Sequence, residues 1–154
     1  MIKKIFLLNF VLLFMNSCGF YSIDDIYKNS LNIKNYKIDG DKEIIYQFKN
    51  ELNLKKNQDQ GREVEILINV SSSRKISEKN KKNKTSKFSL EVKAELILKN
   101  TSGKILKIKN FSKASNYLVN KNSKITRSNK KRLTENLVKS LANEIKIFLK
   151  QYSK

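Results

Sequence analysis

Apolar residues in the first part of the chain predict a strand followed by a helix. Residues 31–38 favour an extended first strand. Gly40 is a turn signal, and Asp39 or Asp41 is suited to cap a helix that follows it. Over about 41–55 the apolar positions then recur at the spacing of one helix face: Ile44, Ile45, Phe48 and Leu52.

The next three segments have a period of two, which is typical of strands with one buried and one solvated face. They span 63–76, 87–99 and about 104–118. This pattern indicates an antiparallel sheet that is covered on one side. The positions expected to face the core are Val64, Ile66, Ile68, Val70, Phe88, Leu90, Val92, Ala94, Leu96, Leu98, Leu106, Ile108, Phe111 and Ala114.

The connections between these strands differ in composition. The segment 77–86 is dense in Lys and Asn and is predicted to be a loop. Residues 100–103 have the composition of a compact hairpin turn, in which Gly103 is available for a positive φ. The alternation changes phase near Asn110, where we expect a β-bulge.

The last segment has the clearest helical pattern in the chain. Apolar residues repeat at helical spacing from Leu133 to Tyr152, and the opposite face is polar. Ser123 or Ser128 is expected to cap this helix. The element order is therefore β-α-β-β-β-α. It predicts an α+β two-layer sandwich, in which a four-stranded, mixed but mostly antiparallel sheet carries two helices on one face.

The amino terminus has the pattern of an export signal. Two lysines are followed by an apolar run from Ile5 to Met15, which is interrupted only by Asn9. As a helix this run rises about 16 Å, roughly half of the hydrocarbon core, so it is too short for a stable membrane span. It is typical of the apolar region of a signal peptide.

The only cysteine in the chain, Cys18, follows this run directly after Asn16 and Ser17. The arrangement resembles a bacterial lipoprotein signal, in which a small residue precedes a cysteine that receives diacylglycerol on its sulfur. The resemblance implies cleavage after residue 17, diacylglycerol and an N-acyl chain on Cys18, and stable anchoring by several acyl chains. Under the sorting rules of lipoproteins, Gly19 in place of Asp implies the outer membrane. The alternative is an ordinary signal peptide with an incidental cysteine.

Composition excludes several classes of protein. The chain has Lys+Arg 33 against Asp+Glu 14, a formal charge of +19, no His and a single Cys. These counts exclude His-based triads, His zinc sites, an internal disulfide and multi-cysteine clusters. The basic residues are nearly all Lys, since only four are Arg, and abundant Lys, Asn and Ile is what an AT-rich genome produces. The charge therefore has two interpretations, genome composition or attraction of anions.

Candidate functional residues are basic rather than catalytic. Glu65 and Glu91 can in principle face each other across strands, but solvated partners for lysines are the simpler interpretation. There is no P-loop, dinucleotide motif, metal-ligand spacing or nucleophile elbow, so we expect no enzymatic activity and no metal.

Two basic patches are candidates for binding phosphates: the 74–87 segment and a weaker patch at the entry to the last helix, where cations are unfavourable for the helix dipole. The second patch consists of Lys121, Lys124, Arg127, Lys130 and Lys131. The alternative for the first patch is a solvated loop that blunts strand edges. The candidate anion-binding residues are Arg74, Lys75, Lys81, Lys82, Lys84, Lys121, Lys124 and Arg127.

Taken together, these features resemble the LptE family of lipopolysaccharide-assembly lipoproteins. The resemblance rests on Cys18-Gly19-Phe20, on the element order, on the Thr101-Ser102-Gly103-Lys104 hairpin and on the long final helix. It covers nearly the whole mature chain. The absence of Pro and of a tail after the last helix departs from many relatives.

The resemblance implies a non-enzymatic protein of the outer membrane, lipid-anchored on its periplasmic side. Such a protein plugs the LptD barrel, assists its assembly and binds lipopolysaccharide, and it has no nucleic-acid partner. It also implies a signal peptide over 1–17, a lipidated tether over 18–30 and a single domain over 31–154. Two alternatives remain: another envelope lipoprotein that binds an anionic polymer or a protein, and a basic nucleic-acid-binding module.

Overall fold

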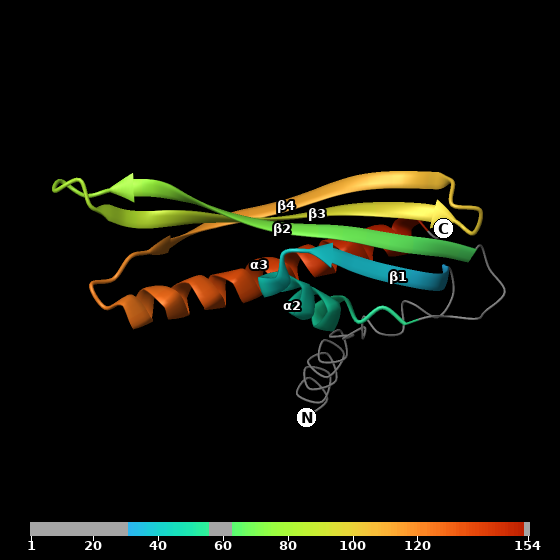
Figure 1. The fold of residues 1–154 in the computed structure, drawn as a ribbon, viewed down its shortest axis with the longest axis horizontal. Helices are drawn as coiled ribbons and strands as arrows, with labels where there is room; N and C mark the ends of the chain where they lie inside the picture. The colour runs from blue at the N-terminus through green and yellow to red at the C-terminus, as the bar shows by residue number, and fades with distance from the viewer. Residues whose placement is uncertain (1–30, 56–62, 153–154) are drawn as a thin grey trace, which may run out of the picture.

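A computed structural model describes residues 31–55 and 63–152 of the chain. In chain order its elements are β1 (Asn32–Gly40), α2 (Lys42–Leu52), β2 (Glu63–Lys79), β3 (Thr85–Asn100), β4 (Ile105–Leu118) and α3 (Ser123–Tyr152) (Figure 1). The predicted signal peptide over 1–17 and tether over 18–30, with Cys18 and Gly19, lie outside the described residues. Among the described helices, none has the length and apolar character needed to cross a membrane.

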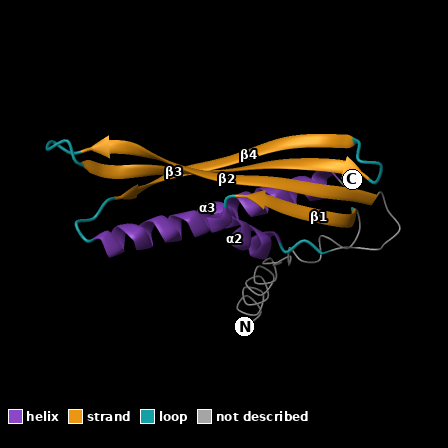
Figure 2. Cartoon of the chain, in the orientation of Figure 1, coloured by secondary structure: helices purple, strands orange, loops and turns teal. Residues whose placement is uncertain are grey.

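The four strands form one mixed sheet in the order β1-β2-β3-β4. β1 pairs with β2 in parallel, whereas β2 with β3 and β3 with β4 are antiparallel. Both helices lie on the same side of this sheet, and α2 crosses close to the middle of α3 (Figure 2). The predicted fold class, a two-layer α+β sandwich with the order β-α-β-β-β-α, is confirmed.

The core lies between the sheet and the helices, where the alternation in β2 and β3 predicted it. Ten residues of these two strands were expected to face inward. All are buried except Phe88, which is partly buried: Val64, Ile66, Ile68, Val70, Phe88, Leu90, Val92, Ala94, Leu96 and Leu98. The helices contribute Ile44, Phe48 and Leu52 from α2, and Leu137, Val138, Leu141, Ala142, Ile145 and Leu149 from α3.

The predicted inward face of β4 is only partly correct. Phe111 packs against the core, but Ile108 and Ala114 are exposed. Their register partners on β3 are Ile97 and Glu91, which alternate with the buried residues of that strand, so this side of β4 faces away from the helices. The irregularity in pairing lies opposite Leu98 and Lys99 rather than at Asn110, because Leu106 is left without a register partner.

Half of the predicted 77–86 loop is strand. β2 continues to Lys79 and β3 starts at Thr85, so only a short turn remains. The Asn80 side chain builds this turn, because its Oδ1 accepts hydrogen bonds of 3.0 Å from the backbone N–H groups of Lys82 and Lys84. The sequence pattern missed the strand extension because lysine-rich segments resemble loops in composition, although β-pairing depends on backbone hydrogen bonds.

The second hairpin turn is built in a similar way. Asn100 Oδ1 accepts from the backbone N–H of Lys104 at 2.8 Å, and Gly103 has φ +80. The prediction that this glycine supplies a positive φ is therefore confirmed. At the corresponding position of the first turn, Asn83 has φ +57, which asparagine tolerates better than most residues.

The helix boundaries depend on polar caps. Asp41 caps α2, since its Oδ1 accepts from the Glu43 backbone N–H at 3.0 Å, whereas Asp39 does not. α2 ends at Leu52, before the predicted 55, with Asn53 in the left-handed region. For α3 the predicted caps Ser123 and Ser128 are wrong. Asn122 Oδ1 accepts from the Lys124 backbone N–H at 2.9 Å and takes that role.

Candidate functional site

A cavity of about 670 Å³ lies between the two layers. Its lining comes from the start of α2, from β2 and the end of β4, and from the amino-terminal half of α3 and the chain that leads into it. Its lining residues are Glu43, Gln47, Arg74, Tyr117, Val119, Asn120, Lys121, Ser123, Thr126, Arg127, Lys130, Lys131 and Thr134. Its volume is in the range of small-molecule sites.

Two features of the fold place this cavity. β2 and β3 are 17 and 16 residues long, so they extend well beyond the 11-residue helix α2. The 30-residue helix α3 continues beneath this extension, and the chain from β4 to α3 closes its far end (Figure 2). The space left between the sheet and α3 beyond α2 is therefore lined by side chains from α2, β2, the end of β4, the chain between β4 and α3, and α3 itself.

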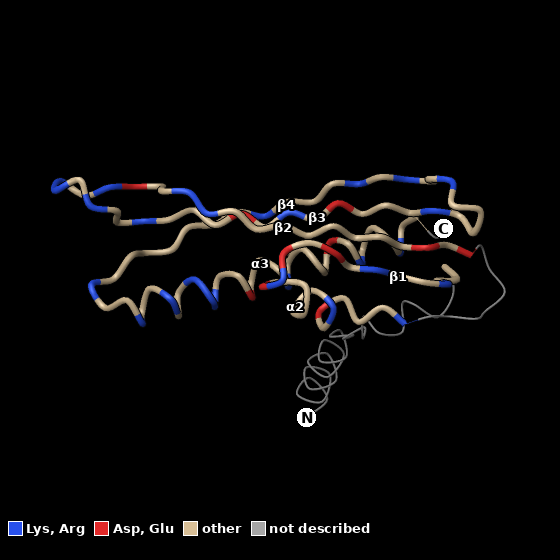
Figure 3. The backbone as a smooth tube through the Cα atoms, viewed as in Figure 1, with Lys and Arg blue, Asp and Glu red and all other residues tan. Residues whose placement is uncertain are grey.

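The lining is strongly cationic. Arg74, Lys121, Arg127, Lys130 and Lys131 contribute five basic side chains, and the only acid in the lining is Glu43. The amino-terminal half of α3 appears as a row of basic positions beneath the sheet in Figure 3. The first turn of α3 has no acidic residue, so its positive dipole end adds to the same field. An anion in the cavity is therefore favoured electrostatically.

Aromatic contacts hold Arg74 in place. Its guanidinium carbon lies 4.6 Å from the centroid of the Phe88 ring. The Phe88 and Tyr117 rings are in turn 5.7 Å apart, so the arginine stacks on a wall made by two neighbouring strands. Stacking keeps a guanidinium extended while its N–H groups stay available for a ligand.

Two buried polar atoms in the lining have no hydrogen-bond partner. They are the Tyr117 hydroxyl and the Gln47 Oε1, and the Tyr117 residue is only 6% exposed. A buried polar group without a partner is costly, and native proteins usually satisfy such groups or use them to bind something. These two atoms supply a donor and an acceptor beside the cationic groups.

Hydrogen bonds fix the segment that leads from β4 into α3. Thr126 Oγ1 accepts from the Asn120 backbone N–H at 2.8 Å and contacts the Asn120 carbonyl oxygen at 3.2 Å. Together with the Asn122 cap, these bonds fix the backbone from which the Lys121 and Arg127 side chains extend. The far wall of the cavity is thus organised before any ligand binds.

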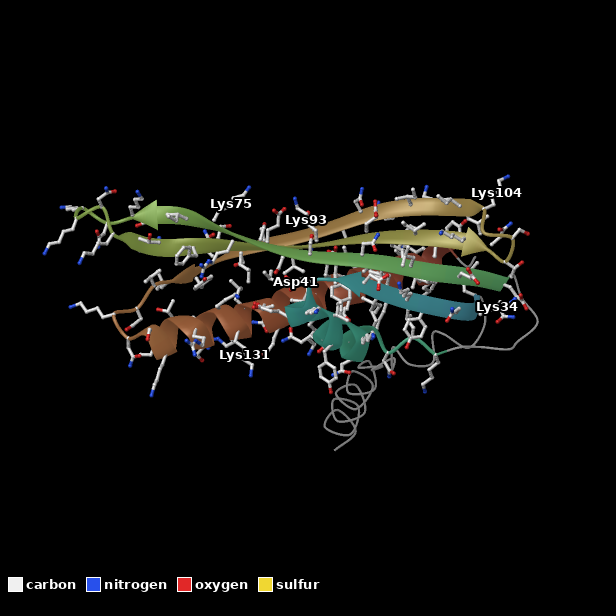
Figure 4. The ribbon with its side chains drawn as sticks, in the orientation of Figure 1. Lys34, Asp41, Lys75, Lys93, Lys104 and Lys131 are labelled. Atoms are coloured by element: carbon white, nitrogen blue, oxygen red, sulfur yellow. The ribbon has the colours of Figure 1, made fainter. Side chains whose placement is uncertain are left out.

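The structure brings together some of the predicted site residues and separates the others. Arg74, Lys121 and Arg127 line the cavity. Lys75 lies on the opposite side of the sheet and points away from the helices (Figure 4). Lys81, Lys82 and Lys84 lie in the exposed turn between β2 and β3, and Lys124 is exposed in the first turn of α3.

Other lining residues were not among the candidate contacts. Lys130 and Lys131 belong to the predicted basic patch at the entry to the last helix, and they follow Arg127 at helical spacing. Glu43, Gln47 and Tyr117 come from distant parts of the chain, and only the packing of α2 beside α3 shows that they share a site.

The two acidic residues that the sequence offered as a possible pair are kept apart by the register of the sheet. Glu65 lies opposite Lys99 and Glu91 opposite Ser73, so the possible Glu65–Glu91 pair is not formed. Within residues 31–55 and 63–152, no group of three or more His, Cys, Asp or Glu side chains is placed to hold a metal ion.

No family model matches the sequence, and no curated protein does. Solved structures of lipoproteins do match the fold. Rare lipoprotein B from Shewanella oneidensis has a TM-score of 0.58 at 13% identity, over 77% of this chain and 95% of that one. A minor lipoprotein from Acinetobacter baumannii has a TM-score of 0.57 at 12% identity, over 77% and 92%. A putative lipoprotein from Caulobacter crescentus CB15 has a TM-score of 0.55 at 12% identity, over 79% and 89%. The chain therefore shares its fold with these lipoproteins.

Proposed function

We propose that this protein is a non-enzymatic lipoprotein of the outer membrane that binds lipopolysaccharide and helps assemble and plug the LptD barrel. Support for the envelope-lipoprotein part comes from two independent sources. Cys18 follows a signal-like apolar run, and the folded part of the chain has the same architecture as lipoproteins of three other bacteria.

The cationic cavity is the observation that carries the ligand part of the proposal. Lipopolysaccharide presents phosphate groups on a sugar backbone next to acyl chains. Arg74 and Arg127 offer planar, multi-donor groups that suit phosphate, and the lysines around them add charge. Val119 and the Tyr117 ring supply apolar lining in the same cavity. The charge and the mixed polar and apolar lining therefore suit a phosphorylated amphiphile.

The proposed location follows from the amino terminus. Acylation of Cys18 with several chains gives stable membrane attachment, and Gly19 directs sorting to the outer membrane. The protein would then lie on the periplasmic side, where lipopolysaccharide arrives before it reaches the cell surface. The barrel is the proposed partner because the LptE resemblance implies it.

Affinity purification from detergent-extracted envelopes tests the partner and the anchor together. A carboxyl-tagged copy is expressed in its own cells, purified and analysed by mass spectrometry. We expect an acylated Cys18 and a large outer-membrane barrel in stoichiometric amount. A Cys18→Ala copy is the control, and it should lose acylation and membrane recovery. An acylated protein without a barrel would contradict the LptD assignment and favour another envelope partner. An unacylated, uncleaved protein would contradict both.

A further inference from the structure

Two oppositely charged side chains in the lining of the cavity form an ion pair. Lys130 Nζ lies 3.0 Å from Glu43 Oε2, and both residues line the cavity. This ion pair joins α3 to the first turn of α2, across 87 positions of sequence. The Glu43 side chain is 71% exposed, whereas that of Lys130 is 35% exposed. The carboxylate is thus the more loosely held member of the pair.

We propose that Glu43 is a specificity-determining residue that occupies Lys130 in the free protein and is displaced when a phosphate group enters the cavity. The inference rests on the proposed function in that the ligand is taken to be a phosphorylated sugar lipid. A phosphate carries nearly two negative charges and three acceptor oxygens, against one charge and two oxygens for a carboxylate. It therefore outcompetes Glu43, whereas a ligand carrying a single carboxylate gains little from the exchange.

The start of α2 can stay in place when the Glu43 side chain leaves Lys130. Two backbone N–H groups hold it: the Glu43 N–H donates to Asp41 Oδ1, and the Asp41 N–H donates to the Val70 carbonyl oxygen at 3.0 Å. Neither bond uses the Glu43 side chain. Once released, that carboxylate is still favourable in the first turn of a helix and faces water. The exchange thus needs only a side-chain rotation.

The unpartnered polar atoms complete the recognition. In the proposed complex the Tyr117 hydroxyl donates to a phosphate oxygen, and the Gln47 Oε1 accepts from a sugar hydroxyl or an amide N–H; both atoms lack a partner in the free protein. Gln47 is one helical turn from Glu43 on α2, so the phosphate that replaces Glu43 brings its sugar close to this acceptor. The cavity therefore selects a phosphate with a hydrogen-bond donor beside it.

Titration calorimetry on the full chain in detergent tests the exchange. Glucose 1-phosphate is the small probe, glucose is its phosphate-free control, and lipopolysaccharide is measured in parallel. We expect Glu43→Gln to tighten binding of both phosphorylated ligands about two- to fivefold, because it removes the competitor. Lys130→Gln should weaken binding about tenfold. In the double variant the gain from Glu43→Gln should disappear.

Glu144→Gln is the matched control for charge. Glu144 on α3 forms an ion pair with Lys113 on β4, and neither residue lines the cavity. If Glu144→Gln tightens binding as much as Glu43→Gln, a general field acts and the exchange is refuted. Binding of lipopolysaccharide without any effect of Glu43 also refutes the exchange, but leaves the proposed function standing. Exchange with glucose 1-phosphate and no lipopolysaccharide binding supports the inference and contradicts the proposed function. Absence of binding by either ligand contradicts both.

Discussion

Arg74 and its neighbour Lys75 lie on opposite sides of the sheet: Arg74 stacks over Phe88 in the cavity, and Lys75 points away from the helices (Figure 4). Two adjacent cations in the sequence therefore have different surroundings, because successive side chains of a strand alternate between its faces. This pair separates the effect of a defined site from the effect of net charge.

Arg74→Gln should weaken lipopolysaccharide binding by about tenfold, because it removes a charged, multi-donor group that the Phe88 ring holds in place. Lys75→Gln removes the same charge from the outer face and should change binding by less than about twofold. Binding of labelled lipopolysaccharide in detergent measures both. Equal losses in the two variants would show that overall charge, and not this cavity, governs binding.

Tyr117→Phe separates binding from stability. Its hydroxyl is buried without a partner, so removing it should leave the free energy of unfolding unchanged or raise it by about 1 kcal/mol. Ligand affinity should fall at the same time, since the hydroxyl is placed to donate to the ligand. Urea titration and ligand binding on the same sample check the two halves. A clear loss of stability would mean that the hydroxyl already has a partner in the folded protein.

Gly40 is predicted to tolerate no side chain. It has φ +123, and a Cβ would lie 1.9 Å from the Val70 carbonyl oxygen, which also accepts from the Asp41 N–H. Gly40→Ala should therefore cost about 3 kcal/mol or more in the free energy of unfolding. Gly103→Ala is the control, because Gly103 also has a positive φ but open space around it, and it should cost only about 1 kcal/mol.

Asp41 should make stability depend on acid pH. The Ser72 hydroxyl donates to its carboxylate, and this bond lowers the pKa of Asp41 below its usual value of 3.8, although partial burial opposes the shift. A lowered folded-state pKa means that the contribution to stability is complete above the unfolded pKa and is lost as the pH falls through the folded pKa. The loss should therefore occur below about pH 4.

Unfolding by urea at pH 7 and pH 3 measures this contribution. Asp41→Asn keeps a capping oxygen but cannot titrate, so the variant should lose less stability between the two pH values than the natural chain does. Asp39→Asn, on a half-exposed carboxylate of β1 two residues before Asp41, serves as the control. An identical pH dependence in the natural chain and Asp41→Asn would contradict the assignment.

Much of the fold could be predicted because β2, β3 and both helices have one clearly apolar face. β4 was also predicted close to its observed bounds, but its inward face was not, because it is an edge strand whose helix-facing side includes Lys107, Lys109 and Lys113. These lysines lie opposite Leu98, Leu96 and Val92. An edge strand does not need a continuous row of apolar side chains on its buried side. The apolar residue Ile108 therefore indicated the wrong side of β4 as the one that faces the helices. Leu106, which has no register partner, also shifts the phase.

The candidate site was predictable only in part, for a related reason. Arg74 and Arg127 were found as members of basic patches, but charge density alone gave equal weight to the turn lysines Lys81 and Lys82. What distinguishes the first pair is the space between the extended hairpin and α3, which is set by the relative lengths of α2 and α3. Glu43 is recognisable as part of the site only through its contact with Lys130.

The lysines on the helix-facing side of β4 affect how readily two copies of the protein associate through this edge strand. Within the described residues β4 has no neighbour on its outer side, so its backbone is open to pairing with another strand. Two copies pairing through β4 would crowd several ammonium groups against each other, which is unfavourable at low dielectric. The lysine bias of this strand thus disfavours association of two copies of the protein through their free sheet edges.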